Sequence, residues 1–112
     1  MYNSFLCSLG GFRTVFREER NFKIEVGAGA LILASACIVD FSWIERALLL
    51  VAVFTVIAAE IINTTLEDLC DKVEPGHDPT IGKIKDMMAA YVLVSVVGAV
   101  LLGVTVYANH YL

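Results

Sequence analysis

Hydrophobic residues are concentrated in three stretches of this 112-residue chain. The longest stretch without a charged residue covers residues 87–108, and the other two cover residues 26–39 and 47–59. Because an α-helix needs about 20 mostly apolar residues to cross a bilayer, the third stretch can span alone and the first two are of marginal length. Backbone polar groups in lipid must be hydrogen-bonded internally, which favours helices. The pattern predicts an all-α membrane protein with three transmembrane helices, at about residues 26–44, 46–70 and 84–108.

The residues before the first span form an amphipathic pattern that predicts a helix at about residues 2–22. Four large apolar side chains recur at helical spacing, namely Phe5, Leu9, Phe12 and Phe16. Three arginines line a neighbouring face, namely Arg13, Arg17 and Arg20. We therefore expect a surface helix that lies in the membrane interface with its arginines towards the lipid phosphates.

The composition supports one small membrane domain. Hydrophobic residues make up 58% of the chain and charged residues only 18%, and a soluble domain of this size would expose much of that apolar surface. The net charge is -4 and there is no basic patch, which argues against a nucleic-acid partner. The cysteines lie far apart and lack metal-ligand spacing, so we assign them no role. Lipids and small molecules are the expected partners.

The distribution of lysine and arginine predicts the orientation in the membrane, because cytoplasmic segments carry an excess of these residues. Residues 1–25 contain four of them and residues 64–86 contain three, whereas the turn at residues 40–46 contains only Arg46. No lysine or arginine follows residue 108. We therefore expect a multi-pass protein with its N-terminus in the cytoplasm and its C-terminus outside.

Polar side chains form a single stripe along the second span and its cytoplasmic extension. At about 100° per residue, four of them fall within one helix face about 80° wide, namely Glu60, Asn63, Glu67 and Asp71. Acids this close repel one another, and a carboxylate near hydrocarbon favours its protonated form. A hard cation such as Mg²⁺ would relieve both penalties, since it binds oxygen ligands.

The stripe predicts a metal site and a general base. Glu67 is placed to bind Mg²⁺, and Glu19 from the surface helix would supply a second ligand. Glu60 lies deeper in the membrane, where a carboxylate binds protons more readily than in water, and this property suits a general base. The alternatives are a purely structural role for Glu60 and an interhelical hydrogen bond for Asn63.

Glu19 belongs to a second stripe, on the surface helix, that also contains Ser8, Phe12 and Val15 at helical spacing. This register directs Glu19 towards the protein rather than towards water. The alternative is that residues 17–20, with the sequence REER, form a solvated charge cluster.

Basic partners for the acids come from residues 72–86, where prolines and glycines interrupt the helical pattern. Lys85 and Asp86 stand just before the third span. A lysine opposite a carboxylate–metal site suits a phosphate-bearing ligand, and the whole set resembles the parts required for phosphoryl transfer. The chain contains neither a P-loop motif nor the protein-kinase motifs, so a kinase here would have another architecture.

Small residues on the third span predict where helices approach closely. Ser95, Ala99 and Gly103 occur at four-residue steps, and small side chains so placed let helices pack tightly in lipid. This is a packing signal and indicates no chemistry.

The sequence EIINTTLEDLCD, residues 60–71, resembles the central signature of the prokaryotic diacylglycerol kinase family, which also includes the undecaprenol kinases. GKIKDMMAA, residues 82–90, is similar to the second signature of that family, and EERNFKIE, residues 18–25, to its N-terminal block. The three blocks match in order and spacing. Thr65 and Leu66 depart from the commoner alanine and isoleucine, and both point away from the acidic stripe.

The resemblance implies a small integral membrane kinase of the bacterial inner membrane that forms homotrimers and transfers the γ-phosphate of ATP to a lipid hydroxyl. It implies that Glu60 takes the hydroxyl proton and that Glu19 and Glu67 hold Mg²⁺. It also implies that five residues contact the nucleotide or its phosphates, namely Ser8, Asn63, Asp71, Lys85 and Asp86. Glu25 matches a family position near the lipid substrate.

Two lipids remain open as the substrate, undecaprenol and diacylglycerol. The EERNF block is similar to the undecaprenol kinase branch, whereas Glu25 stands where the diacylglycerol branch has an acid. The residues favour the polyprenol only slightly.

A rival hypothesis is a small membrane transporter or proton carrier that uses the intramembrane Glu60 as a relay. It leaves Glu67 and Lys85 without a role. A non-catalytic membrane adaptor is a third class, and it would require none of these polar residues.

Overall fold

The computed structural model describes residues 2–112, with side chains from residue 3. Its four helices are α1 (Tyr2–Glu18), α2 (Arg20–Ile38), α3 (Trp43–Val73) and α4 (Pro79–Tyr111). The described part of the chain contains no strand. α2, α3 and α4 are each long and apolar enough to cross a membrane. The prediction of an all-α membrane protein with an N-terminal helix and three spanning helices is confirmed.

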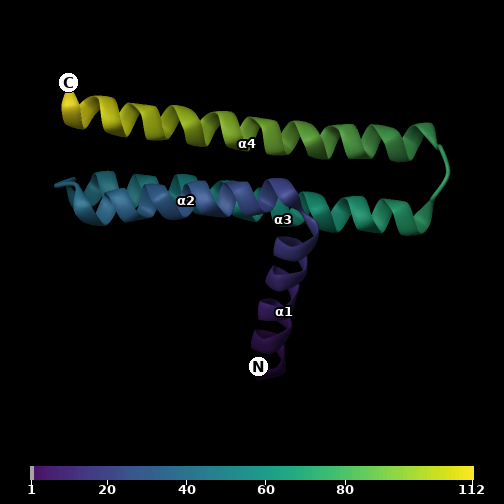
Figure 1. The fold of residues 1–112 in the computed structure, drawn as a ribbon. Coiled ribbons are helices and arrows are strands. Elements are labelled where there is room, and N and C mark those ends of the chain that lie inside the picture. Colours follow the sequence, from purple (N-terminus) through teal and green to yellow (C-terminus); the bar gives the residue numbers. More distant parts are fainter. Residues whose placement is uncertain (1) are drawn as a thin grey trace.

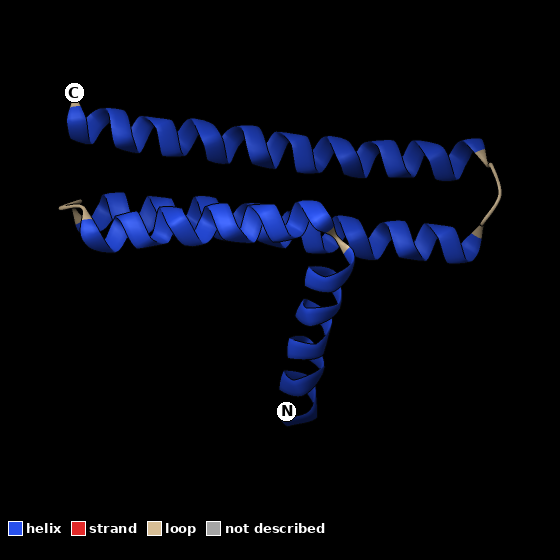
Figure 2. Cartoon of the chain, viewed as in Figure 1, coloured by secondary structure: helices blue, strands red, loops and turns tan. Residues whose placement is uncertain are grey.

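The three long helices lie lengthwise beside one another, and α1 projects sideways from the start of α2 (Figure 1). α3 and α4 form an antiparallel hairpin that is joined by a short loop (Figure 2). Both α2 and α4 pack on α3, but the backbones of α2 and α4 do not contact each other within residues 2–112. A space between α2 and α4 therefore remains for side chains or a ligand.

The break between α1 and α2 lies at Glu19, earlier than the boundary near residue 22 that the amphipathic pattern suggests. Glu19 has extended backbone angles, with φ -108° and ψ 112°, which interrupt the helix for one residue. Phe22 is fully buried, and its ring packs edge-on against Phe12 and Phe16 at centroid distances of 5.4 Å and 6.4 Å. This aromatic cluster spans the break and holds α1 at its steep angle to α2 (Figure 1).

The turn between α2 and α3 is held by two capping arrangements. α2 ends at Ile38, earlier than the sequence pattern suggests, and Arg46 Nε donates to the carbonyl oxygen of Ala36 at 2.8 Å. At the start of α3, Ser42 and Glu45 form a reciprocal capping box. Both arrangements satisfy backbone groups that helix ends leave unpaired, so the short turn is well defined.

α3 is longer than a membrane is thick. Its 31 residues correspond to about 46 Å at 1.5 Å per residue, whereas the hydrocarbon core measures about 30 Å. The C-terminal part of α3 therefore carries polar residues out of the apolar layer.

At the start of α4, Asp78 Oδ2 accepts a hydrogen bond from Ile81 N at 3.0 Å, and Pro79 occupies the first turn. These two residues fix where α4 begins, and the short loop before them places that start beside the polar end of α3 (Figure 2).

α2 approaches α3 closely at Gly29. A Cβ atom at Gly29 would lie 2.8 Å from Val53 Cγ1, whereas one at Gly103 would meet no atom within 4 Å. Gly103 therefore does not lie at a close helix contact inside this chain. Large apolar side chains remain exposed along the spanning helices, as expected for surfaces that face lipid or another subunit.

Candidate functional site

The polar stripe of α3 forms one continuous face. Asn63 Nδ2 donates to Glu67 Oε1 at 3.2 Å, which places these two side chains one above the other. Glu60, Asn63 and Glu67 are half-buried, and Asp71 near the end of the helix is exposed. The stripe thus leads from the apolar part of α3 to its polar end, in the register that the helical spacing predicts.

Lys85 reaches the stripe from the beginning of α4. Its ammonium nitrogen lies 2.5 Å from Asp71 Oδ1, and 37% of the Lys85 side chain and 63% of the Asp71 side chain are exposed. Asp86 follows Lys85 on α4 and is exposed. The hairpin therefore brings the Lys85 ammonium group and the Asp71 carboxylate together at the polar end of the spanning helices.

Glu25 of α2 approaches Glu60 of α3 closely enough for the two carboxyl groups to interact. The Oε2 atom of Glu25 is buried and has no hydrogen-bond partner in the part of the chain that the structure describes. A buried carboxyl oxygen without a partner suits a ligand that donates a hydrogen bond, because an unpaired polar atom in an apolar setting is costly. The helical wheel could not reveal this pair, since it relates residues of one helix only.

Glu19 is half-buried at the break between α1 and α2, and its side chain does not cap α2. Its charged neighbours are exposed, namely Arg17, Glu18 and Arg20. The REER segment is therefore a solvated cluster except at Glu19. Ser8 is exposed, and its hydroxyl group donates to the carbonyl oxygen of Ser4 at 2.8 Å, within its own helix.

The oxygen atoms near Glu67 are suited to a phosphate-bound Mg²⁺. Within residues 2–112, no group of three or more His, Cys, Asp or Glu side chains could hold a metal ion by itself. Asn63 Oδ1, however, is buried without a partner beside the Glu67 carboxylate. Proteins that bind Mg²⁺ together with a nucleotide use one or two carboxylates and leave the remaining positions to phosphate and water. The residues present therefore fit this kind of site.

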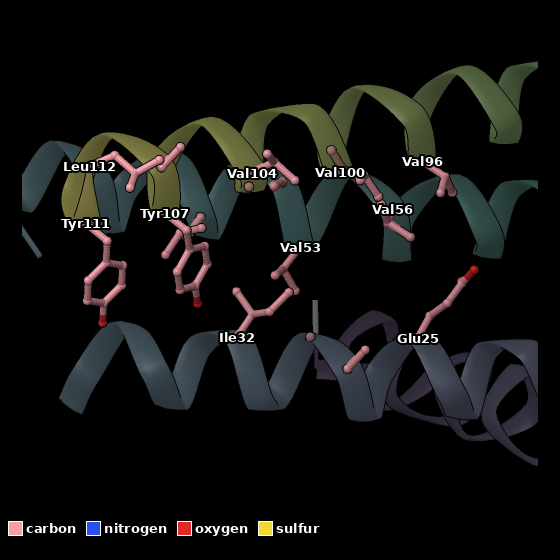
Figure 3. Close-up of a pocket in the computed structure, with 17 residues that line it drawn as sticks. Glu25, Ile32, Val53, Val56, Val96, Val100, Val104, Tyr107, Tyr111 and Leu112 are labelled. Carbon is pink, nitrogen blue, oxygen red and sulfur yellow. The ribbon is translucent and has the colours of Figure 1, made fainter. Parts of the chain in front are cut away.

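An apolar groove lies between α2 and α4, with α3 behind it (Figure 3). Its volume is about 740 Å³. Glu25 stands at one end of the groove, and Tyr107 and Tyr111 point across the other end (Figure 3). Aliphatic side chains line the length between them, including Ile32, Val53, Val56, Val100 and Val104.

The sequence analysis did not predict this groove, although a signal was present. Small residues on the two facing helices leave the space open, namely Ala28 on α2 and Ala99 and Gly103 on α4. The packing rule for small residues suggests that helices approach at such positions. Of the three small residues that the pattern singles out on α4, Ala99 and Gly103 line the groove, whereas Ser95 lies beside α3.

A second unpredicted cluster ties the end of α4 to the start of α3. His110 Nδ1 lies 3.6 Å from Glu45 Oε1, and Asn109 Nδ2 donates to Glu45 Oε2 at 3.5 Å. The rings of Phe41 and His110 are 4.6 Å apart. These contacts hold the far end of the groove in place.

The fold and the site define an α-helical membrane protein in which an apolar groove leads to half-buried carboxylates and then to a lysine at the polar end of a helix hairpin. Residues 6–107 match the family that is described as prokaryotic diacylglycerol kinase. This match covers most of the sequence, and the chain belongs to the prokaryotic diacylglycerol kinase family.

Several similar proteins carry the name diacylglycerol kinase. The protein from Escherichia coli K12 is 31% identical over 101 residues, which cover 90% of this chain and 83% of that protein. The protein from Pseudomonas aeruginosa is 31% identical over 83 residues, which cover 74% and 68% of the two chains. The protein from Synechocystis sp. is 30% identical over 101 residues, which cover 89% and 58%. The family and these relatives indicate a lipid kinase of the diacylglycerol kinase type.

Proposed function

We propose that this chain transfers the γ-phosphate of ATP to the hydroxyl group of a membrane lipid, either undecaprenol or diacylglycerol. The supporting observation is the continuity between the groove and the polar stripe. Glu25 stands at the end of the groove and interacts with Glu60, and the stripe continues from Glu60 towards the polar end of α3. A lipid hydroxyl that arrives from the membrane and a nucleotide that arrives from water would meet beside Glu60.

In the proposed reaction, Glu60 accepts the proton of the lipid hydroxyl while the hydroxyl oxygen attacks the γ-phosphorus. The new bond joins this oxygen to phosphorus, and the bond between the γ-phosphorus and its bridging oxygen to the β-phosphate breaks. The products are a lipid monophosphate and ADP. Glu25 orients the lipid hydroxyl towards Glu60.

The remaining polar residues position the phosphates. Glu19 and Glu67 would hold Mg²⁺, which would neutralise charge on the phosphate oxygens. Asn63, which donates to Glu67, places the γ-phosphate next to that carboxylate. In the resting site the ammonium group of Lys85 is held by Asp71, and the phosphates would draw it away as a charge-assisted donor.

Ser8 and Asp86 complete the proposed nucleotide site. Both side chains are exposed, so a nucleotide can reach them from water. This arrangement requires the polar end of the hairpin and the N-terminus to face the cytoplasm of a bacterium, with the C-terminus outside the inner membrane.

The proposed active form is a homotrimer. Many large apolar side chains of α4 are exposed along its length. Further subunits would cover part of this apolar surface, since contiguous exposed apolar surface favours association.

The proposal is tested by incubating the purified protein in lipid–detergent micelles with Mg-ATP and either undecaprenol or diacylglycerol, side by side. We expect a lipid monophosphate from at least one of them, identified by mass spectrometry. Glu60→Gln should lower kcat by about 10²- to 10⁴-fold while the oligomeric state is unchanged. Asp68→Asn is the matched control, since Asp68 is an exposed acid of α3 that lies off the stripe.

Two results would contradict the proposal. A wild-type rate for Glu60→Gln would show that Glu60 is not the base. Proton or solute flux across sealed vesicles without ATP consumption, together with no lipid product, would favour the transporter hypothesis.

A further inference from the structure

A side-chain bridge that the proposed mechanism does not use crosses the groove about one helical turn before its far end, where Tyr111 lines it. The backbones of α2 and α4 do not contact each other in the described chain, yet the hydroxyl groups of Ser35 on α2 and Tyr107 on α4 are hydrogen-bonded across the gap. Ser35 Oγ donates its proton to the carbonyl oxygen of Ile32 at 2.7 Å. The Ser35 hydroxyl oxygen therefore accepts in the bridge, and the Tyr107 hydroxyl group donates. The bridge therefore spans the space between the two helices at the level of Tyr107.

The position of the Tyr107 ring is held from a second side. The ring packs edge-on against Phe41, with centroids 5.2 Å apart and an interplanar angle of 87°. Phe41 is only 2% exposed, so it is itself held by the surrounding core. A ring with a hydrogen bond at its tip and an aromatic contact on its side has little freedom to swing out of the groove.

The distance from Glu25 to the bridge is set by α2. Glu25 and Ser35 belong to the same helix, and the ten residues from one to the other correspond to about 15 Å at 1.5 Å per residue. This is about half of the roughly 30 Å thickness of a hydrocarbon core. A lipid tail that starts beside Glu25 would therefore extend over about 15 Å, the hydrocarbon thickness of one leaflet, before it reached Tyr107.

The lining of the groove favours a lipid tail over a helix from another subunit. The groove holds about 740 Å³ and is lined by aliphatic side chains up to the carboxyl group of Glu25, whose Oε2 atom has no hydrogen-bond partner in the described part of the chain. An alkyl chain with a hydroxyl group at one end matches this change from apolar to polar lining and supplies a hydrogen-bond partner for the carboxyl group, whereas an apolar helix face would leave it unpaired.

We propose that Tyr107, held by Ser35 and Phe41, is a stop that sets how much of the substrate's tail the groove can bury. This inference rests on the proposed function and adds a specificity-determining residue to it. Tail atoms as far as Tyr107 contribute binding energy, and atoms beyond it do not. KM should therefore fall as the tail is lengthened and then reach a plateau, whereas kcat should stay the same.

The test uses a homologous series of the lipid alcohol that the wild-type protein phosphorylates, with tails of increasing length in mixed micelles. Tyr107→Ala removes the stop, so the plateau in KM should move to longer tails, with a further fall in KM of about tenfold if roughly two more methylene groups are buried. Gly103→Leu should move the plateau to shorter tails, because Gly103 lines the groove one turn before Tyr107 and a Cβ atom there meets nothing within 4 Å. Tyr91→Ala is the control, since Tyr91 lies on α4 outside the groove and is 49% exposed.

The two variants keep the test decisive even if Tyr107→Ala does not fold, since Gly103→Leu probes the same groove in the opposite direction. An unchanged plateau in the folded variants would overturn the stop while leaving the kinase activity in place. A change of oligomeric state in Gly103→Leu without a shift of the plateau would identify a second copy of the chain in the groove and would also overturn it. Absence of any lipid product from the wild-type protein would instead contradict the proposed function.

Discussion

Lys85 at the start of α4 pairs with Asp71 near the end of α3, with 2.5 Å between Nζ and Oδ1. The two residues are brought together by the hairpin at the polar end of the spanning helices (Figure 1). The pair is substantially exposed, and exposed ion pairs contribute little to stability. Its position beside the polar stripe instead suits a lysine whose ammonium group leaves the Asp71 carboxylate and binds a phosphate when the nucleotide arrives.

The first prediction concerns this exchange. Lys85→Met should raise the KM for ATP by about tenfold or more, because a charge-assisted hydrogen bond to phosphate is lost. Thermal unfolding in detergent should be nearly unchanged. Steady-state kinetics with varied ATP measure the effect, and Lys83→Met is the control, since Lys83 is an exposed lysine on the same helix. Equal KM values for the two variants would show that Lys85 does not contact the nucleotide.

The second prediction concerns the metal. Glu67→Gln should raise the Mg²⁺ concentration required for half-maximal activity by about 10- to 100-fold, because an amide is a weaker ligand for a hard cation than a carboxylate. Activity is measured over a magnesium titration after treatment with EDTA. Asp68→Asn should follow the wild-type curve, since it removes a neighbouring charge that lies off the stripe. A superimposable curve for Glu67→Gln would show that Glu67 is not a ligand.

The third prediction concerns the crossing of α2 and α3. Gly29→Val should destabilise the protein by about 1–3 kcal/mol, because its side chain would overlap Val53 in a closely packed contact. Gly27→Ala should have no such cost, since a Cβ atom there meets nothing within 4 Å. Unfolding in a denaturing detergent gives both values.

A second-site test decides whether the cost at Gly29 comes from this contact. Val53→Ala should recover part of the stability that Gly29→Val loses, because it removes the methyl group that lies 2.8 Å from the new Cβ position. Strictly additive losses in the double variant would place the origin of the cost elsewhere.

The fourth prediction concerns the opposite end of the groove. Glu45→Ala should lower the thermal unfolding temperature more than His110→Gln does, because Glu45 both completes the capping box of α3 and contacts α4. In the absence of Glu45, His110→Gln should cost less than it does alone, since the contact between the two residues is already lost and only the ring contact with Phe41 remains to be removed. Thermal unfolding of the two single variants and the double variant measures this coupling. Independent effects would show that the contact does not join α4 to α3.

Much of the fold could be predicted from local patterns. Apolar stretches of sufficient length predicted three spanning helices, and the structure confirms them. The register of the stripe also followed from the chain, because side chains four residues apart lie on the same helix face, as the Asn63–Glu67 hydrogen bond illustrates. The helix limits were less accurate, since the break at Glu19 depends on the burial of Phe22 between the rings of α1.

Contacts between different helices could not be predicted from these local patterns. The Glu25–Glu60 neighbourhood, the Ser35–Tyr107 bridge and the Glu45–His110 contact each join residues from different helices. Their formation depends on how far each helix is rotated about its axis and displaced along its neighbour, which periodicity within one helix does not specify. The groove has the same origin, because α2 and α4 both pack on α3 and leave a space between them.

The sequence by itself determined the membrane class, the helices and the single polar face of α3, because hydrophobic length and a period of 3.6 residues are properties of one segment. Only the tertiary structure decided which helices meet, where the groove lies and which side chains stand at its two ends. Those features arise from packing between segments that are distant in the chain, and packing depends on the shapes of all the side chains together.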